Sequence, residues 1–304
     1  MIGIQEAYSK CYKINHKETF TISCRDVNST TAQTICYELY VRVLKPYIAS
    51  GMPKPKINTK AEYKNYYMAM PKEDVKKMKE GVNMFSTSTN YNTSTGKVNY
   101  KGGVQWGNIG KSREMMDDAK IASTVRIAID YLKSEPTCKL VIFCTYRRDI
   151  ARAKELLVNY NPLVLNGSVT KEEDRVDIID KFQADNNDYR VMIAHPKVGG
   201  VGVELDDKFG NRERIELVLP SYFFIDQFQA TCRIRRIDTK SRTRVFFMYS
   251  KEFPNETGII NSMAHKSETL KKMIYESDDD VRYPGEYETY IEPDLITEHG
   301  LITV

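Results

Sequence analysis

The chain has 304 residues, 41% of them apolar and 28% charged, so it is long enough to bury the core of one large domain or two ordinary ones. No stretch approaches the roughly eighteen uninterrupted apolar residues of a membrane span, and the N-terminus lacks the apolar block of a signal peptide. We therefore expect a soluble, intracellular protein with no membrane partner. Its six cysteines include no CxxC pair, so we expect reduced thiols and not a disulfide framework.

The net charge of +4 is unevenly distributed along the chain. The first 134 residues carry 21 Lys and Arg against 12 Asp and Glu, whereas the segment from 276 onward carries one basic and nine acidic residues. A basic front half is compatible with nucleic acid as a partner. The acidic end, 276–304, is expected to be a solvated tail.

Residues 1–117 are predicted to be mainly helical with one long loop. Apolar residues recur at helical spacing in 31–47 and 73–84, which predicts two helices. The stretch 85–110 is rich in Ser, Thr, Asn and Gly, which predicts a loop. This region reads as a linker or as the remnant of a preceding lobe.

No metal site is predicted in this region. Cys11, His16, Cys24 and Cys36 lie near one another in the sequence, but they lack the short paired spacings of structural zinc sites.

From Lys139 onward the chain alternates short β-rich runs with amphipathic segments, which is typical of a parallel sheet with crossover helices. Near-continuous apolar runs among the strands predict a sheet covered on both faces. The predicted strands are 140–144, 162–165, 190–194, 214–219 and 244–249. The predicted helices are 118–132, 149–159, 171–183, 222–234 and 257–275. Residues 118–275 are therefore predicted to form one α/β domain.

A glycine cluster follows the third of these strands. Gly199, Gly200 and Gly202 allow backbone amides to approach an anion closely, or simply allow a tight turn from strand to helix. In an open parallel sheet, ligands bind beyond the carboxyl ends of the strands, which is where this loop lies.

The run from Gln229 to Ile237 places two arginines three residues apart. On a helix, Arg233 and Arg236 would project from one face, one turn apart and behind the amide of Gln229. Two guanidinium groups in this arrangement suit a cluster of phosphate oxygens, although a solvated basic helix has the same spacing.

The order of these elements resembles the C-terminal RecA-like lobe of superfamily 2 helicases, most closely the branch of Swi/Snf-related ATPases. The resemblance covers about 118–275. It rests on Val141-Ile142-Phe143, Leu165-Asn166-Gly167, Arg175 with Phe182, Gly199-Gly200-Val201-Gly202, and Gln229-Ala230 followed by Arg233, Arg236 and Ile237. The family usually has Gly at the positions of Cys232 and Asp238, and more often Asn at that of Glu204.

The resemblance implies a role for each matching residue. Arg233 and Arg236 match the arginine fingers that reach the γ-phosphate of ATP bound on the first lobe, and Gln229 matches a polar residue of the same motif. Gly200, Gly202 and Glu204 match a loop that couples the nucleotide to the nucleic-acid backbone. The candidates for contacts to DNA or RNA are Tyr146, Arg147, Lys197, Val198 and Gly199.

An ATPase of this kind also needs a first lobe with the motif G-x-x-x-x-G-K-[ST] and an acidic pair for Mg²⁺. Gly110-Lys111-Ser112 is the nearest candidate, but Gln105 stands where the first glycine is required and no buried strand precedes it. We therefore expect ATP and Mg²⁺ to be held mainly by a P-loop lobe on another chain or segment, so that this chain is not a self-sufficient enzyme. The alternative is a non-catalytic module that binds nucleic acid or protein and retains the helicase fold.

Overall fold

The computed structural model describes residues 12–14, 22–24, 59, 61–91, 98–100, 106–199, 202–254, 258–274, 287–294, 296–297 and 300–301. The chain divides into two compact units, Met1–Pro55 with Ser267–Val281, and Lys56–Lys266 with Arg282–Val304. In the first unit, β1 (Tyr12–Ile14) and β2 (Ile22–Cys24) pair as antiparallel strands. The second unit contains the main sheet and all candidate site residues.

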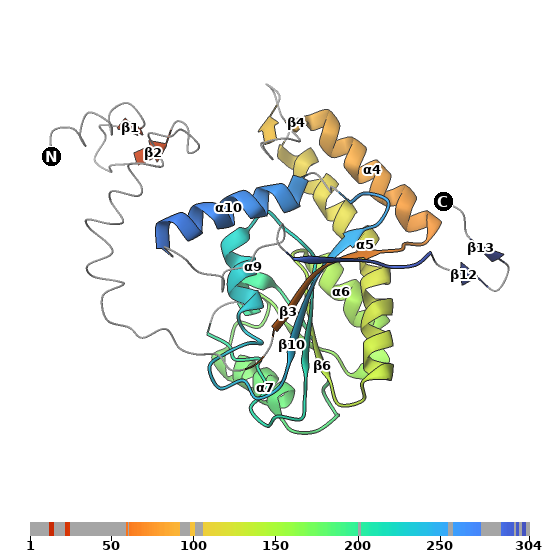
Figure 1. Ribbon diagram of the computed structural model, residues 1–304, viewed down its shortest axis with the longest axis vertical. Helices are drawn as coiled ribbons and strands as arrows, with labels where there is room; N and C mark the ends of the chain where they lie inside the picture. Colours follow the sequence, from red (N-terminus) through yellow and green to blue (C-terminus); the bar gives the residue numbers. More distant parts are fainter. Residues whose placement is uncertain are drawn as a thin grey trace. The chain divides into compact units, whose positions relative to one another are not determined.

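Seven strands form this sheet in the order β11-β3-β10-β9-β6-β8-β7 (Figure 1). They are β3 (Ala61–Met68), β6 (Lys139–Phe143), β7 (Leu163–Leu165), β8 (Val191–Ala194), β9 (Arg214–Val218), β10 (Thr243–Ser250) and β11 (Glu288–Ile291). Each pair of neighbours in the sheet is parallel, so the carboxyl ends of all these strands lie on one edge. The predicted RecA-like α/β fold, with a parallel sheet flanked by helices, is confirmed.

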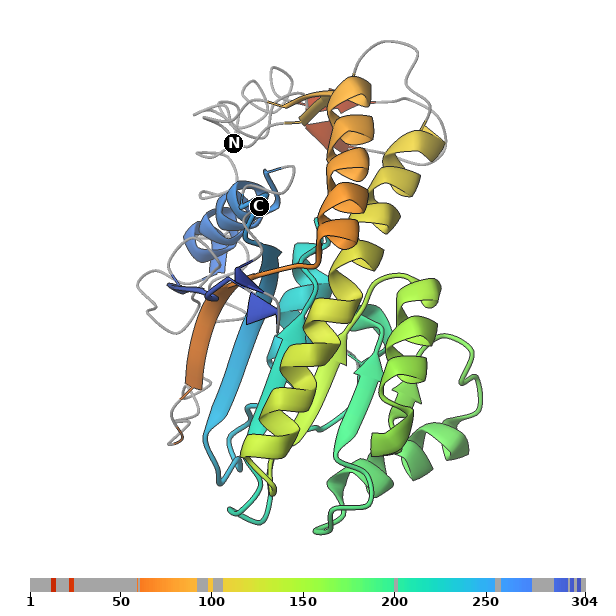
Figure 2. The same ribbon diagram turned by 90° about the vertical axis from the view of Figure 1, so that its right-hand side faces the viewer.

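Helices cover both faces of the sheet (Figure 2). They are α4 (Lys72–Ser88), α5 (Trp106–Ser134), α6 (Arg147–Leu156), α7 (Glu172–Gln183), α8 (Pro196–Gly199), α9 (Phe224–Thr231) and α10 (Ile259–Ile274). Side chains of α5 and α6 pack in the core on one face, and side chains of α7 and α9 pack on the other. None of the helices in the described part of the chain is long and apolar enough to cross a membrane.

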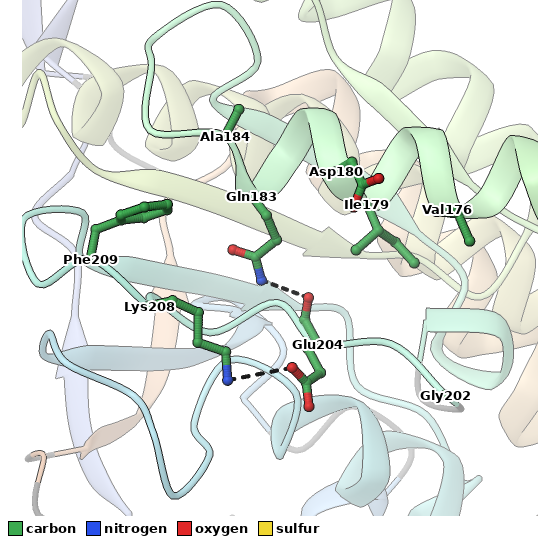
Figure 3. A pocket seen from close by; sticks show the side chains of 9 residues that line it. All are labelled: Val176, Ile179, Asp180, Gln183, Ala184, Gly202, Glu204, Lys208 and Phe209. Atoms are coloured by element: carbon green, nitrogen blue, oxygen red, sulfur yellow. Dashed lines mark hydrogen bonds and ion pairs between the residues drawn. The ribbon is translucent and has the colours of Figure 1, made fainter.

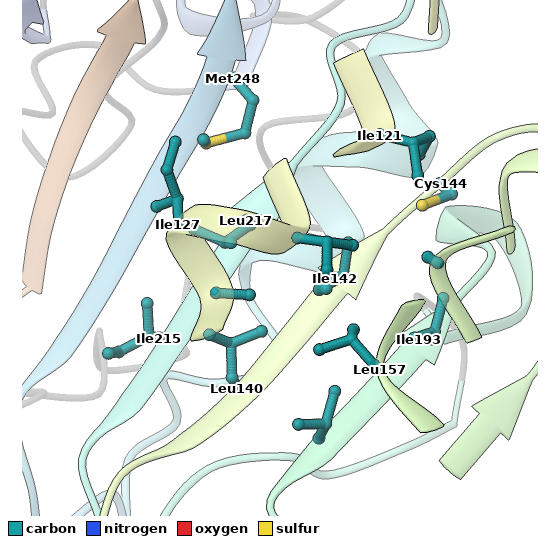
Figure 4. Packing of buried hydrophobic residues seen from close by; sticks show 14 of the residues in the cluster. Ile121, Ile127, Leu140, Ile142, Cys144, Leu157, Ile193, Ile215, Leu217 and Met248 are labelled. Carbon is teal, nitrogen blue, oxygen red and sulfur yellow. The ribbon is translucent and has the colours of Figure 1, made fainter. Parts of the chain in front are cut away.

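The strands are buried on both sides because their apolar residues alternate between two cores. Leu140 and Ile142 of β6 belong to the core under α5 and α6, which Figure 4 shows from close by. Val141 and Phe143 belong to the core under α7 and α9. This alternation explains why the central strands read as continuous apolar runs in the sequence.

Helices α4 and α5 form an antiparallel pair that extends beyond the carboxyl edge of the sheet (Figure 2). Gly81 allows their close approach, because a Cβ atom there would lie 2.7 Å from Cγ of Met116 and 3.0 Å from the carbonyl oxygen of Ser112. The strands β4 (Thr89–Tyr91) and β5 (Val98–Tyr100) pair as an antiparallel hairpin between the two helices.

Two expectations for the N-terminal region differ from this fold, and one lies outside the described residues. The loop predicted over 85–110 is wrong where α4 continues to Ser88, β4 and β5 pair, and α5 begins at Trp106. Strand β3 lies in the N-terminal region that we predicted to be mainly helical. The helix predicted over 31–47 lies outside the described residues.

The end of the chain also departs from the expected solvated tail. Strand β11 pairs in parallel with β3, and the carboxylate of Glu292 receives two hydrogen bonds of 2.7 Å from Arg126 on α5. Farther on, β12 (Ile296–Thr297) and β13 (Gly300–Leu301) form a short antiparallel pair. A bidentate ion pair with a helix thus fastens an acidic segment to the sheet edge, which local charge does not reveal.

We predict that Gly81→Val lowers the free energy of unfolding by about 1–3 kcal/mol, because the new side chain overpacks the contact between α4 and α5. Chemical denaturation followed by circular dichroism measures this change. Gly110→Val is the matched control, since a Cβ atom there meets nothing within 4 Å and valine has a slightly better helix propensity than glycine. Equal destabilisation by the two variants would contradict the close approach at Gly81.

Candidate functional site

Most of the candidate nucleic-acid residues follow two adjacent strands at the carboxyl edge of the sheet. Tyr146 and Arg147 follow β6, and Lys197, Val198 and Gly199 follow β8, its neighbour. The structure therefore brings these five residues to one edge, as the sequence predicts for a parallel sheet.

The side chains at this edge differ in exposure. Arg147 and Lys197 are exposed. Arg147 is the first residue of α6, and the N–H groups of a first helical turn favour a bound anion. Tyr146 is half-buried, and this burial raises the pKa of its phenol to about 12. The edge thus presents two exposed cations beside a phenol that stays protonated at neutral pH.

The glycine loop, residues 199–202, has two described glycines with different roles. Gly199 allows close packing, and Gly202 adopts a backbone conformation that favours glycine. A Cβ atom at Gly199 would lie 2.9 Å from Cε1 of Phe143 and 3.2 Å from Cβ of Ala194, so glycine lets the end of α8 pack closely against β6 and β8. Gly202 has φ of +71°, a left-handed conformation that disfavours other residues. Gly200 lies outside the described residues.

The arginine run does not continue the helix, which corrects the sequence prediction. Helix α9 ends at Thr231, and Arg233 and Arg236 lie in the irregular segment that follows it. The side chain of Ile234 packs in the core under α7 and α9, where it is fully buried. A continued helix would not combine this buried side chain with the contacts that the two arginines make.

Backbone hydrogen bonds hold this arginine turn, residues 232–239, against the segment 203–206. The carbonyl oxygen of Arg233 accepts a hydrogen bond of 3.0 Å from the N–H of Leu205. The N–H of Arg236 donates to Oγ1 of Thr239 (2.6 Å), which in turn donates to the buried carboxylate of Asp206 (3.1 Å). The positions of both arginines are thus set by a buried framework and not by helical periodicity.

The guanidinium groups of Arg233 and Arg236 are half-buried and electrostatically coupled. Burial lowers the pKa of Arg233, and the positive charge of Arg236 lowers it further. One Nη atom of Arg236 lies 3.4 Å from the carbonyl oxygen of Val203. Two cations held close together by the backbone form a site that an anion would stabilise.

The remaining residues of this run have different surroundings. Gln229 lies on α9 and is exposed, whereas Gln227 is fully buried and donates a 2.9 Å hydrogen bond to the carbonyl oxygen of Leu219. Arg235 has an Nη atom 3.4 Å from the carbonyl oxygen of Thr59 and also hydrogen-bonds Tyr63. Arg235 therefore points toward a different part of the unit from Arg236.

Glu204 and Gly202 line a pocket of about 560 Å³ beside α7 (Figure 3). The Glu204 carboxylate pairs with Lys208 at 3.4 Å, and its backbone carbonyl oxygen accepts a 2.7 Å hydrogen bond from Gln183. Glu204 also lies near Arg233, whose protonated form it favours. The structure thus places Glu204 at the exposed margin of the arginine turn.

A cluster of charged residues lies where α4, α5 and α6 meet. It was not predicted from the sequence. The carboxylate of Asp118 pairs with Lys77, with Arg152 at 3.0 Å and with Arg148 at 3.5 Å. Asp149 is fully buried, and neither of its carboxylate oxygens has a hydrogen-bond partner among the described residues. The available signal was the Arg147-Arg148-Asp149 triplet after a buried strand, since Asp149 lies beside the core-facing Ile150.

The nearest P-loop candidate is not a phosphate-binding loop. Gly110, Lys111 and Ser112 lie inside α5, and Oγ of Ser112 donates a 2.8 Å hydrogen bond to the carbonyl oxygen of Ile109. Among the described residues, no group of three or more His, Cys, Asp or Glu side chains is arranged to hold a metal ion. Of the four zinc candidates only Cys24 lies within the described residues.

Part of the chain matches a known family. Residues 122–208 match the family described as helicase conserved C-terminal domain. The match includes the candidate residues from Tyr146 to Glu204 and ends before Gln229, Arg233 and Arg236. No curated protein matches the chain.

Two solved structures are similar to this chain at low identity. The C-terminal part of the Fun30 ATPase domain is 14% identical, with 71% of this chain and 98% of that chain covered and a TM-score of 0.45. The E. coli DEAD-box protein SrmB bound to regulator of ribonuclease activity A (RraA) is 13% identical, with 60% and 90% covered and a TM-score of 0.37. Both TM-scores are below 0.5, so the match of residues 122–208 to the helicase C-terminal family is the finding that bears on function.

We predict that Asp149→Asn removes a pH dependence from the stability of the protein. Burial, and then the nearby Asp117, raise the pKa of Asp149 from 3.8 to about 8. The folded protein therefore keeps a proton that the unfolded chain releases, and this contribution to stability is complete below about pH 4 and is lost as the pH rises through about 8.

The variant should match the parent near pH 4 and exceed its free energy of unfolding by more than about 1 kcal/mol near pH 9, as measured by urea unfolding. Glu155→Gln, an exposed position on the same helix, is the control and should show a difference that does not vary with pH. A constant difference between Asp149→Asn and the parent across this range would refute the buried, protonated carboxyl.

Proposed function

We propose, from the premise that residues 122–208 form a helicase conserved C-terminal domain of the superfamily 2 type, that this chain acts as the second lobe of an ATP-driven motor on DNA or RNA. In this proposal Arg233 and Arg236 complete a nucleotide site whose other wall is a P-loop lobe on a different chain or segment. The observation that carries the proposal is the arginine turn, which holds two coupled guanidinium groups at the margin of the conserved domain.

The arginine turn suits transfer of a phosphoryl group. The charge on the γ-phosphate oxygens spreads during the reaction, and an arginine that contacts them stabilises the transition state without forming a covalent bond. The positive charge of Arg236 acts on Arg233, and in this proposal a phosphate bound by both arginines would reduce their mutual repulsion. In this proposal exposed Gln229, on the last turn of α9, is a further polar group of the nucleotide site.

The carboxyl edge supports contact with a nucleic-acid backbone. Arg147 and Lys197 are exposed cations on adjacent strands, and Tyr146 offers a phenol that remains a hydrogen-bond donor. Such groups bind backbone phosphates whatever the base sequence. A motor that moves along a nucleic-acid strand needs contacts of this kind. Val198 and Gly199 belong to α8, and in this proposal the backbone of this short helix adds to the phosphate contacts.

The magnesium ion that accompanies ATP does not fit the described part of this chain, which has no group of side chains arranged to hold a metal ion. We therefore assign the ion and most of the nucleotide contacts to the P-loop lobe. The role of this chain is to present the two arginines, the exposed margin at Gly202 and Glu204, and the backbone contacts at the carboxyl edge.

We predict that Arg236→Ala lowers nucleic-acid-stimulated ATP hydrolysis by about 10³-fold or more when the chain is assayed with a P-loop polypeptide that forms a complex with it. The loss reflects the missing charge at the transferring phosphoryl group. Turnover is measured by phosphate release at saturating ATP, with and without a nucleic acid.

Arg235→Ala is the matched control, because Arg235 lies in the same turn but contacts Thr59 and Tyr63. It should retain turnover within about a few-fold of the parent. Unchanged hydrolysis in Arg236→Ala, with a thermal midpoint equal to that of the parent, would sink the arginine-finger role. Nucleic-acid binding by the chain with no hydrolysis in any combination would instead favour the non-catalytic interaction module.

We also predict that the double variant Arg147→Ala and Lys197→Ala weakens binding of DNA or RNA oligonucleotides equally for unrelated sequences. Each lost phosphate contact should reduce the magnitude of the slope of log K against log salt by roughly one. Fluorescence anisotropy over a salt series measures both quantities. Lys154→Ala, an exposed lysine near the other end of α6, is the control, and an equal effect there would argue against a specific contact edge.

A further inference from the structure

The pocket beside α7 combines exposed apolar side chains with a helix of strongly negative charge. Val176 of α7 is 49% exposed and Phe209 is 53% exposed, and both line the pocket. Figure 3 shows Phe209 and Val176 on opposite sides of it, with Ile179, Asp180 and Gln183 between them. Large apolar side chains exposed around a concave surface are typical of a binding site.

The charge on α7 is opposite to that of the chain as a whole. The helix carries five acidic residues and two basic ones, whereas the net charge of the chain is +4. Asp177 pairs with Lys181 at 2.6 Å. Within the described part of the chain, no ion pair engages the exposed acidic residues Glu172, Glu173, Asp174 and Asp180.

The polar groups inside the pocket are already engaged with one another. The amide of Gln183 donates to the carbonyl oxygen of Glu204 and accepts a 3.0 Å hydrogen bond from Arg214. Lys208 pairs with Glu204 and, at 3.0 Å, with the buried Asp206. The pocket therefore offers an apolar surface and one free carboxylate side chain, Asp180, for contact with a ligand.

The side of the pocket formed by Phe209 and the end of α7 lies away from the carboxyl edge, although Gly202 and Glu204, which also line the pocket, belong to the loop assigned to the motor. Helix α7 ends at Gln183 and leads to the amino end of β8, and Phe209 precedes the amino end of β9. The candidate contacts for nucleic acid follow the carboxyl ends of β6 and β8. A negatively charged helix at this position would repel a phosphate backbone.

We propose that the pocket docks a basic, amphipathic peptide segment of a partner protein. A large apolar side chain of the segment enters between Phe209 and Val176, while lysines or arginines flanking it face Asp180 and the acidic first turn of α7. Burial of the apolar side chain supplies affinity, and the charges select this segment over acidic peptides and nucleic acid. The inference does not require the proposed motor function, because it uses Phe209, Val176 and Asp180 and not the arginine turn.

Binding of a fluorescein-labelled peptide built only of Leu and Lys, with Leu along one face of a helix, tests the proposal. The full chain should bind this peptide saturably. It should bind two control peptides much more weakly: the same peptide with Glu in place of Lys, and a peptide of Lys alone. Phe209→Ser and Asp180→Lys should each weaken binding about tenfold. Both positions are exposed, so the folded state should persist, which a thermal unfolding curve verifies.

Two control variants match the exposure and charge changes elsewhere on the surface. Val158→Ser removes an apolar side chain that is 65% exposed, and Glu155→Lys reverses an exposed charge on α6. Neither should change the affinity for the Leu and Lys peptide, and neither Phe209→Ser nor Asp180→Lys should weaken binding of an oligonucleotide.

Three results would overturn the proposal. The first is absence of saturable binding of the Leu and Lys peptide. The second is equal binding of the Lys-only peptide with no effect of Phe209→Ser, which would mean that charge alone attracts the peptide. The third is competition by an oligonucleotide together with loss of oligonucleotide binding in Phe209→Ser, which would assign the pocket to nucleic acid.

Discussion

One buried guanidinium group, that of Arg214, connects the sheet to the segment on which the site depends. Arg214 is fully buried at the start of β9, and its Nε donates a 2.8 Å hydrogen bond to the carbonyl oxygen of Leu205. Its Nη2 donates to Oε1 of Gln183 at 3.0 Å and to the carbonyl oxygen of Asp206 at 3.3 Å. Burial lowers the pKa of Arg214 to about 10, a cost that these acceptors and nearby carboxylates offset. The segment 203–206 is therefore fixed in place, and the arginine turn is hydrogen-bonded to it.

The same framework joins the two surfaces to which we assign functions. Gln183 lines the pocket beside α7 and bonds both Arg214 and Glu204. Leu205 is the next residue after Glu204, and its N–H donates a hydrogen bond to the carbonyl oxygen of Arg233. The floor of the pocket and the arginine turn thus share a continuous set of hydrogen bonds, although they face different ligands in our proposals.

The central strands were predictable because burial on both faces leaves a signal in every residue. The arginine turn was not, because helical spacing is a local property, whereas the end of α9 depends on the burial of Ile234 and on a bond to Leu205, almost thirty residues earlier. Strands β3 and β11 escaped prediction for a similar reason. They mix tyrosines with charged residues and become strands only by pairing with β10 and with each other. Buried charges were equally hidden: Lys139 reads as a solvent-facing lysine, yet its Nζ lies 2.6 Å from the carbonyl oxygens of Phe182 and Ala184 at the end of α7.

The position of the arginines outside the helix strengthens the case for a role with phosphate. On a helix, Arg233 and Arg236 would owe their spacing to periodicity, and a solvated basic face would explain them equally well. In the turn, their positions are set by Leu205, Asp206 and Thr239, which are all buried. Leu205 and Asp206 belong to the segment that matches the helicase family, so the turn is anchored to the conserved domain although it lies beyond the match. A buried framework that holds two cations near each other supports our proposal that both of them bind one anion.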